Sequence, residues 1–321
     1  MSRAVAKHKL AAGAFTVLSV YILIGLFSES YSLYCAFSGK NPLYEESDMS
    51  RAYESPSSQH WIGTDYKGRD VFWRAFFAVK TAIKIGVIAS GISMLIGVVL
   101  GALAGYFGGW VDDVTVWIYS TFAAMPSLLF ILAFSLLVTK GFMHPYVTET
   151  VKHLTDSLNL LLCFLHPSLA RVVAAISIEP GMLALYLGIG LTGWVSLCRV
   201  VRAEVMKLRD GAFVQAARCL GFGDARIIFR HILPNVFHLV IIYFTMRFAY
   251  AIMTEVIVSY LGLGVQLEPS WGVMISDGQQ RLWRGVWWEV GAATGFMFFF
   301  VLSLHIAGDA LRDILDPRLK T

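Results

Sequence analysis

The chain has 321 residues, of which 57% are hydrophobic and only 15% are charged, and its formal net charge is +4. A soluble domain of this length cannot cover so much apolar surface, so the composition excludes a soluble globular fold and indicates a protein that lies in the bilayer. A net charge this small is read as a signal of membrane topology and not as a nucleic-acid footprint.

Apolar runs that are long enough to cross about 30 Å of hydrocarbon recur along the whole chain. We therefore predict an all-α polytopic membrane protein with six transmembrane helices. The first run is too long for a cleavable signal peptide and no small-residue cleavage pattern follows it. The predicted spans are residues 10–28, 82–106, 114–138, 182–200, 236–260 and 287–307.

Basic residues gather before the first span, between the fourth and fifth spans, and after the last span. Because Lys and Arg near span ends stay on the cytoplasmic side, both termini, 1–9 and 309–321, are predicted to be cytoplasmic. The stretches 29–81, 139–181 and 261–286 then face outward. The basic residues are Arg3, Lys7, Lys9, Arg199, Arg202, Lys207, Arg209, Arg218, Arg226, Arg230, Arg312, Arg318 and Lys320.

The outward stretch 139–181 is apolar in two parts separated by His166 and Pro167. Since proline breaks a helix, we expect two short helices on the outer face, with an added pair of spans as the alternative. The other long outward stretch, 29–81, is expected to form a small cap. Cys35 and Cys163 fall in these two stretches, and whether they pair is left open.

Glycine recurs every four residues in the second span, at Gly97, Gly101 and Gly105. This spacing places all three on one side of a helix, where the absence of side chains lets a neighbouring helix approach closely. We predict a helix-packing stripe there. General tolerance of glycine in membrane helices is the alternative.

The cytoplasmic segment between the fourth and fifth spans predicts a short amphipathic helix at 211–221. Asp210 is expected to cap its start and Gly221 to supply the turn at its end. Phe213, Ala216, Ala217 and Leu220 follow the i, i+3, i+4, i+7 spacing of one helix face. We expect this face to bind another protein, and a helix that lies on lipid headgroups is the alternative.

Two charged residues, Arg247 and Glu255, interrupt the fifth span. An arginine at the centre of a span costs about 2.5 to 3.5 kcal/mol on insertion scales. Eight residues of helix correspond to about 12 Å, which is too far for a direct pair. Both residues are therefore candidates to line a path through the membrane, with a structural contact between helices as the alternative.

Five motifs together resemble the dipeptide and oligopeptide permease subfamily of ABC importers, on the second of its two membrane subunits. The resemblance covers about 60–138 and 182–320 and is absent from 139–181. The cytoplasmic motif, Val-Gln-Ala-Ala-Arg-Cys-Leu-Gly at 214–221 with Arg-His-Ile-Leu-Pro-Asn at 230–235, is similar to the EAA loop of such subunits. The other motifs lie at 61–70, 105–112, 259–272 and 311–319.

The resemblance implies a non-catalytic subunit of an inner-membrane importer with a permease core at 82–308. Its expected partners are a second permease subunit in a heterodimer, two ATPase subunits that hold ATP and Mg, and an extracytoplasmic substrate-binding protein. The chain has no phosphate-binding Gly-Lys-Ser/Thr loop, so it is expected to hold no cofactor or metal of its own and to bind no nucleic acid.

The resemblance also assigns roles and a cargo. The ATPase-coupling residues would be Phe213, Gln215, Ala216, Ala217, Leu220 and Gly221, with Gln215 in place of the glutamate that names the loop. The expected cargo is a di- or oligopeptide, whose carboxylate Arg247 could meet in the path. Nickel or another small solute is the alternative cargo, and a membrane-embedded enzyme or a lipid-binding scaffold is the alternative of a different class.

Overall fold

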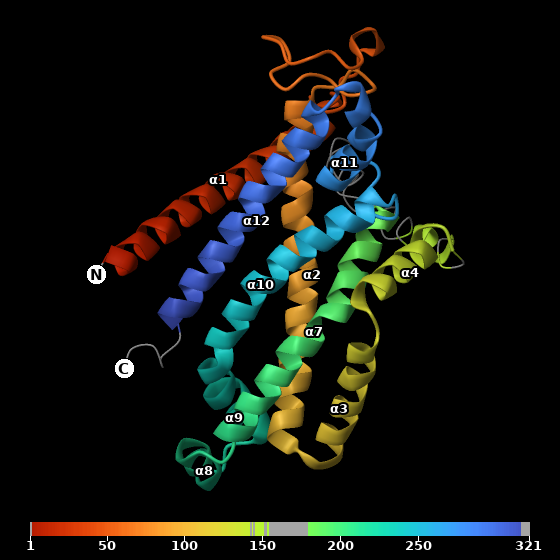
Figure 1. Ribbon diagram of the computed structural model, residues 1–321. Coiled ribbons are helices and arrows are strands. Elements are labelled where there is room, and N and C mark those ends of the chain that lie inside the picture. The colour runs from red at the N-terminus through yellow and green to blue at the C-terminus, as the bar shows by residue number, and fades with distance from the viewer. Residues whose placement is uncertain (1, 142, 144, 151–152, 154–178, 316–321) are drawn as a thin grey trace. The chain divides into compact units, whose positions relative to one another are not determined.

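The computed structural model describes residues 2–141, 143, 145–150, 153 and 179–315, with side chains from residue 9 onward. Within this part of the chain every regular secondary-structure element is a helix. The only strand-like contact there is one isolated bridge between Thr64 and Asp70. Figure 1 shows the helices in chain order. The prediction of an all-α polytopic membrane protein is confirmed.

Among the described residues, five helical stretches are each long and apolar enough to cross a membrane. α1 and α2 extend well into the stretch 29–81 that was predicted to lie between spans. The first continues until Gly39, whose φ is +66°, and the second begins directly after Asp70. The Asp70 carboxylate accepts the backbone N–H of Phe72 at 2.8 Å and so caps this start. The helices concerned are α1 (Ser2–Ser38), α2 (Val71–Phe107), α7 (Pro180–Leu208), α10 (Leu233–Tyr260) and α12 (Trp288–Leu315).

The third predicted span is not one straight helix. α3 (Gly109–Ala124) and α4 (Ser127–Thr139) are bent by 86° at the break between them, and they make a sixth span if the pair is counted as one. Pro126 explains the break, because proline has no N–H to donate and disfavours helical backbone in the residue before it. Met125 is accordingly extended, with a ψ of 135°. The prediction of a continuous helix over 114–138 was wrong.

Three predictions concern residues outside the described part of the chain. The two short helices expected within 139–181 fall mostly on residues that the structure does not describe, and Cys163 is one of those residues. Cys35 is buried and is a free cysteine. The tail from 316 onward, with the last four residues of the motif at 311–319, also lies outside the described residues.

The chain divides into two compact units. Unit 1 consists of residues 1–85, 132–185 and 252–304, and unit 2 of residues 86–131, 186–251 and 305–321. In unit 1 the motif at 61–70 folds around a buried ion cluster. Arg74 Nη1 lies 2.7 Å from Asp65 Oδ2 and 3.0 Å from Glu289 Oε1, and all three side chains are at most 5% exposed.

Unit 2 contains the motif at 214–235. α8 (Ala212–Cys219) and α9 (Asp224–Ile227) follow α7, and a π-helix (Ile228–Ile232) leads into α10. Pro234, the second residue of α10, has no N–H for the carbonyl of Arg230, and a wider turn in the segment before it accommodates the loss. Figure 1 shows α8 and α9 beside the ends of α2 and α7.

Candidate functional site

The short helix α8 begins and ends at glycine. Gly211 occupies the N-cap in an extended conformation and forms no side-chain cap hydrogen bond. The prediction that Asp210 caps the helix was therefore wrong, because the helix starts one residue later and the Asp210 carboxylate instead lies 3.6 Å from Arg209. Gly221 has a φ of +78°, so it supplies the left-handed turn that only glycine adopts at little cost.

Of the four residues predicted to form the binding face of α8, three are exposed and one is buried. Phe213 and Leu220 are 41% and 73% exposed, and Ala216 is also exposed. Ala217 is 4% exposed, together with Val214 at 0%. The prediction that Ala217 faces a partner was wrong, because that side of α8 packs against the chain itself. The surface open to another molecule is formed by Phe213, Ala216 and Leu220.

The buried side of α8 belongs to a continuous hydrophobic core. Val214 and Ala217 share one cluster with residues of α2, α7, α9, the π-helix and α10. Apolar burial on this scale stabilises by about 25 cal/mol per Å², so α8 is firmly attached to these helices. The other buried members of the cluster are Ala102, Tyr106, Leu197, Val201, Val205, Ile227, Ile228, Ile232, Val236 and Val240.

Polar contacts add a second attachment between α2 and the segment that contains α8 and α9. The Tyr106 hydroxyl donates to Asp224 Oδ1 at 2.6 Å, and the Arg218 guanidinium lies 5.4 Å from the Tyr106 ring centroid. Sequence reasoning missed the partnership of Tyr106 and Asp224. The sequence did point to Tyr106, because this residue is part of the motif at 105–112. Only the fold shows that its partner is Asp224.

Gln215 is exposed on α8, and its side-chain amide donates to the backbone carbonyl of Asp210 at 3.2 Å. This contact satisfies a carbonyl just before the helix. The amide can therefore serve the local fold without a charge at this position.

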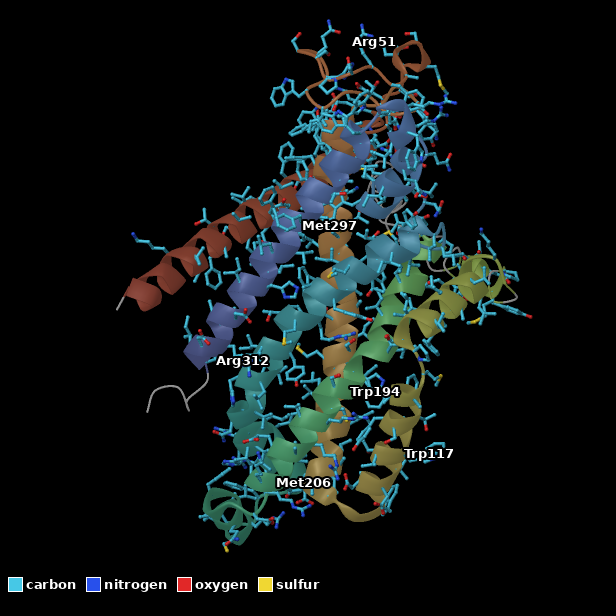
Figure 2. All side chains as sticks on the ribbon, viewed as in Figure 1. Arg51, Trp117, Trp194, Met206, Met297 and Arg312 are labelled. Atoms are coloured by element: carbon cyan, nitrogen blue, oxygen red, sulfur yellow. The ribbon has the colours of Figure 1, made fainter. Side chains whose placement is uncertain are left out.

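The glycine stripe of α2 lies directly against the backbone of α7. A Cβ atom on Gly97, Gly101 or Gly105 would stand 3.0, 2.8 or 2.7 Å from a carbonyl oxygen of α7. Those oxygens belong to residues 194, 198 and 202, which repeat at the same four-residue interval. Trp194, labelled in Figure 2, also packs edge-to-face on Phe122 of α3, with ring centroids 5.8 Å apart. The stripe thus allows two helix backbones to approach closely.

Glu255 does not face a path through the membrane. Its side chain is 1% exposed, and one carboxylate oxygen accepts hydrogen bonds from Ser259 Oγ at 2.8 Å and Ser270 Oγ at 2.6 Å. The prediction that this residue lines the path was wrong, because the motif at 259–272 encloses it. Its role in unit 1 is structural.

Arg247, unlike Glu255, has a buried side-chain nitrogen without a hydrogen-bond partner. Its guanidinium lies 4.5 Å from the ring centroid of Tyr250, and its Nε is buried without a hydrogen-bond partner. Gly193 of α7 leaves room for it, since a Cβ there would stand 2.3 Å from Arg247 Nη2. Among the described residues no carboxylate forms an ion pair with Arg247. The charge of Arg247 therefore has no acidic counterpart in the described part of the chain.

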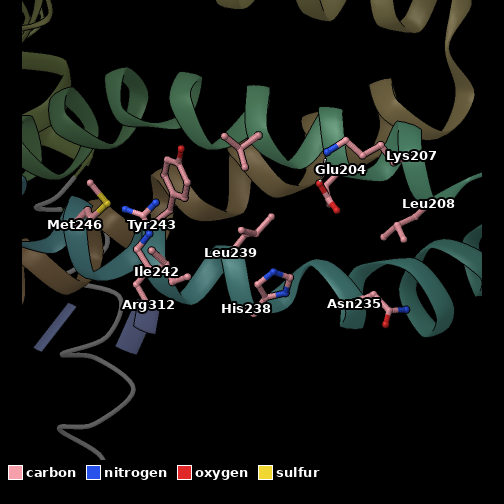
Figure 3. Close-up of a pocket in the computed structure, with 11 residues that line it drawn as sticks. Glu204, Lys207, Leu208, Asn235, His238, Leu239, Ile242, Tyr243, Met246 and Arg312 are labelled. Atoms are coloured by element: carbon pink, nitrogen blue, oxygen red, sulfur yellow. Dashed lines mark hydrogen bonds and ion pairs between the residues drawn. The ribbon is translucent and has the colours of Figure 1, made fainter. Parts of the chain in front are cut away.

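A groove of about 600 Å³ runs between α7 and α10 in unit 2 (Figure 3). Its apolar walls carry few charges. Glu204 and Lys207 form an ion pair of 2.9 Å, and Arg312 of α12 reaches the groove as well. The other lining residues are Val200, Leu208, Asn235, His238, Leu239, Ile242, Tyr243 and Met246.

Comparison with known proteins identifies the family. A family model described as binding-protein-dependent transport system inner membrane component matches residues 97–321. The chain belongs to this family. The matched region contains α8, the whole α2 glycine stripe and Arg247, so the features described above lie in a multi-pass membrane component of a transport system.

Curated relatives match nearly the whole chain. The oligopeptide transport system permease protein OppC of Bacillus subtilis is 31% identical over 314 residues, which cover 98% of this chain and 87% of the relative. The dipeptide transport system permease protein DppC of the same organism is 31% identical over 322 residues, covering 99% and 85%. The glutathione transport system permease protein GsiD of Pectobacterium atrosepticum is 30% identical over 275 residues, covering 85% and 78%.

Proposed function

We propose that this chain is a permease subunit of an ATP-driven importer for peptides. Membership of the family supports a transport subunit, and relatives named for oligopeptide, dipeptide and glutathione transport support a peptide cargo. In this proposal a second, similar permease subunit completes the translocation path. Two ATPase subunits that hold ATP and Mg bind on the cytoplasmic side, and a substrate-binding protein delivers the peptide from outside.

The single observation that carries the proposal is the construction of α8. One side exposes Phe213, Ala216 and Leu220, as a protein-binding surface requires, while Val214 and Ala217 anchor the other side in a core shared with α2, α7 and α10. A movement of an ATPase bound to the exposed side would therefore be passed to three membrane-spanning helices. A helix without this anchoring would move alone.

The orientation in the membrane is part of the same proposal. Basic residues gather at both termini and around α8, and the side on which they are retained is the cytoplasm. With six spans, α8 and both termini then lie on the side where ATP is available. The stretch before α2 and the stretch before α7 face the binding protein.

The cargo is tested with the complete complex in proteoliposomes. The proposal predicts ATP-dependent uptake of a labelled dipeptide or oligopeptide in the presence of the loaded binding protein. Uptake of nickel ions without uptake of any peptide would establish the alternative cargo. ATP hydrolysis with uptake of neither would contradict the importer itself.

The docking role of α8 is tested with a pair of variants. Leu220→Ser removes the most exposed apolar side chain of the surface, and we expect at least about a tenfold loss in affinity for the ATPase, equivalent to about 1.4 kcal/mol. Arg230→Ser is the matched control, because it removes an exposed charge from the same cytoplasmic segment. If binding to anionic vesicles is measured instead, a larger loss for Arg230→Ser than for Leu220→Ser would favour the lipid-binding scaffold.

A further inference from the structure

The starting point is the uncompensated charge of Arg247 in the middle of α10. A buried charge is retained in a membrane protein when it meets a partner or water, and isolated ones mark functional sites. The acidic residue of this helix, Glu255, accepts hydrogen bonds from Ser259 and Ser270 within its own unit. Arg247 has a half-buried side chain, a buried Nε without an acceptor, and no acidic partner among the described residues.

The guanidinium is also held in place before any partner arrives. One side lies over Gly193, where even a single Cβ would collide with Nη2, and the Tyr250 ring lies 4.5 Å from Cζ. A planar guanidinium held in this way keeps its N–H groups in a fixed plane, which suits paired hydrogen bonds to a carboxylate.

The break between α3 and α4 lies next to this arginine. The Ser127 hydroxyl, at the first residue of α4, lies 3.2 Å from the hydroxyl of Tyr250, which in turn stacks on Arg247. Broken helices occur inside membranes where they are buried in protein or line a water-filled cavity. The first amides of α4 have no acceptor within the helix, and a helix N-terminus favours an anion.

We infer that Arg247 binds the carboxylate of the transported peptide as it crosses the membrane, with Tyr250 and Ser127 as neighbouring polar groups. This inference rests on the proposed function. A permanent ion pair with the companion permease would be the other source of a carboxylate. The broken helix and the hydroxyl groups of Tyr250 and Ser127 near Arg247 favour the substrate, because discontinuous helices with polar groups at the break are typical of substrate sites in transporters.

The test uses the complete complex in proteoliposomes with the binding protein saturated by one of two peptides of the same sequence. One peptide has a free carboxyl terminus and the other a terminal amide. Arg247→Gln is expected to lower uptake of the free acid by about tenfold to a hundredfold, as for loss of a charged hydrogen bond, and to change uptake of the amide little. Arg247→Lys, which keeps the charge without the planar fork, is expected to lie between.

Arg199→Gln is the matched control, because Arg199 also stacks on a tyrosine, with Cζ 4.8 Å from the Tyr119 ring centroid, but is exposed and away from the break. Its uptake of both peptides should equal that of the unmodified complex. Equal losses for both peptides in Arg247→Gln, or no loss, would overturn the inference. So would loss of the companion permease on purification, because the carboxylate would then belong to that subunit. Failure of the unmodified complex to import either peptide would instead reject the proposed function.

Discussion

The two units differ in the partners they give to an arginine that is removed from solvent, fully at Arg74 and partly at Arg247. In unit 1, Arg74 is 5% exposed and pairs with Asp65 and Glu289, so every charge has a counterpart in the same chain. In unit 2, Arg247 lies against the Tyr250 ring, its Nε is buried without an acceptor, and no carboxylate among the described residues pairs with it. Arg74 is therefore paired within its unit, whereas the role inferred above for Arg247 depends on a carboxylate from outside the chain.

The largest effect is expected from breaking the cluster of unit 1. Arg74→Met leaves Glu289 buried without its cation and Asp65 with Arg69 alone, which should cost about 3 to 5 kcal/mol of unfolding free energy. Thermal or denaturant unfolding of the detergent-solubilised protein measures it. Arg51→Met is the control, because its pair with Asp48 is 47% and 58% exposed and such surface pairs contribute about 0 to 1 kcal/mol. Equal losses in the two variants would erase the distinction between paired and exposed charges.

An intermediate effect is expected at Glu255. Ser270→Ala removes one of the two hydroxyl donors to a fully buried carboxyl group, which should cost about 1 to 3 kcal/mol. Ser50→Ala removes a comparable hydrogen bond, from Ser50 Oγ to Asp48 at 2.6 Å, but at an exposed site. The same unfolding measurement should show little change for Ser50→Ala. A larger effect there than at Ser270 would show that burial does not determine the cost.

The smallest effect is expected for the stability of Arg247→Gln. Because no carboxylate in the described residues depends on Arg247, its removal leaves no orphaned charge and should change the unfolding free energy by less than about 0.5 kcal/mol. Arg74→Gln, measured alongside, should instead lose several kcal/mol. A comparable loss in both would mean that Arg247 is structural, and the contrast between the two units would fail.

The sequence predicted the membrane class and the positions of the apolar runs, because burial in lipid needs long uninterrupted hydrophobic stretches. It did not predict the break at Met125, although Pro126 was visible, because the run 114–138 satisfies the length rule when it is counted across the proline. The helix ends also differ, since polar residues in the first turns of α2 are tolerated by cluster contacts around Arg74 that come from distant segments.

The sequence could predict where the short helix α8 lies, but not which of its residues are exposed and which are buried. Spacing located a short helix at α8 and placed four small or apolar residues on one side. Which of them is covered depends on the approach of α9 and α10, so the exposure of Ala216 and the burial of Ala217 follow only from the fold. In the same way, the sequence alone does not distinguish Arg247 from Glu255. The fold does, because it places the hydroxyl groups of Ser259 and Ser270 on the Glu255 carboxylate.

The most direct test of the central claim, that α8 is the cytoplasmic docking helix for an ATPase, uses its own cysteine. Cys219 is exposed at the end of α8, whereas Cys35 and Cys198 are buried. In a Cys163→Ser variant, with Cys219→Ser as the control, a membrane-impermeant maleimide should label inverted vesicles stripped of ATPase and leave intact cells unlabelled. Labelling should slow when the ATPase is added back. Labelling of Cys219 in intact cells, or an unchanged rate with the ATPase bound, would contradict the account.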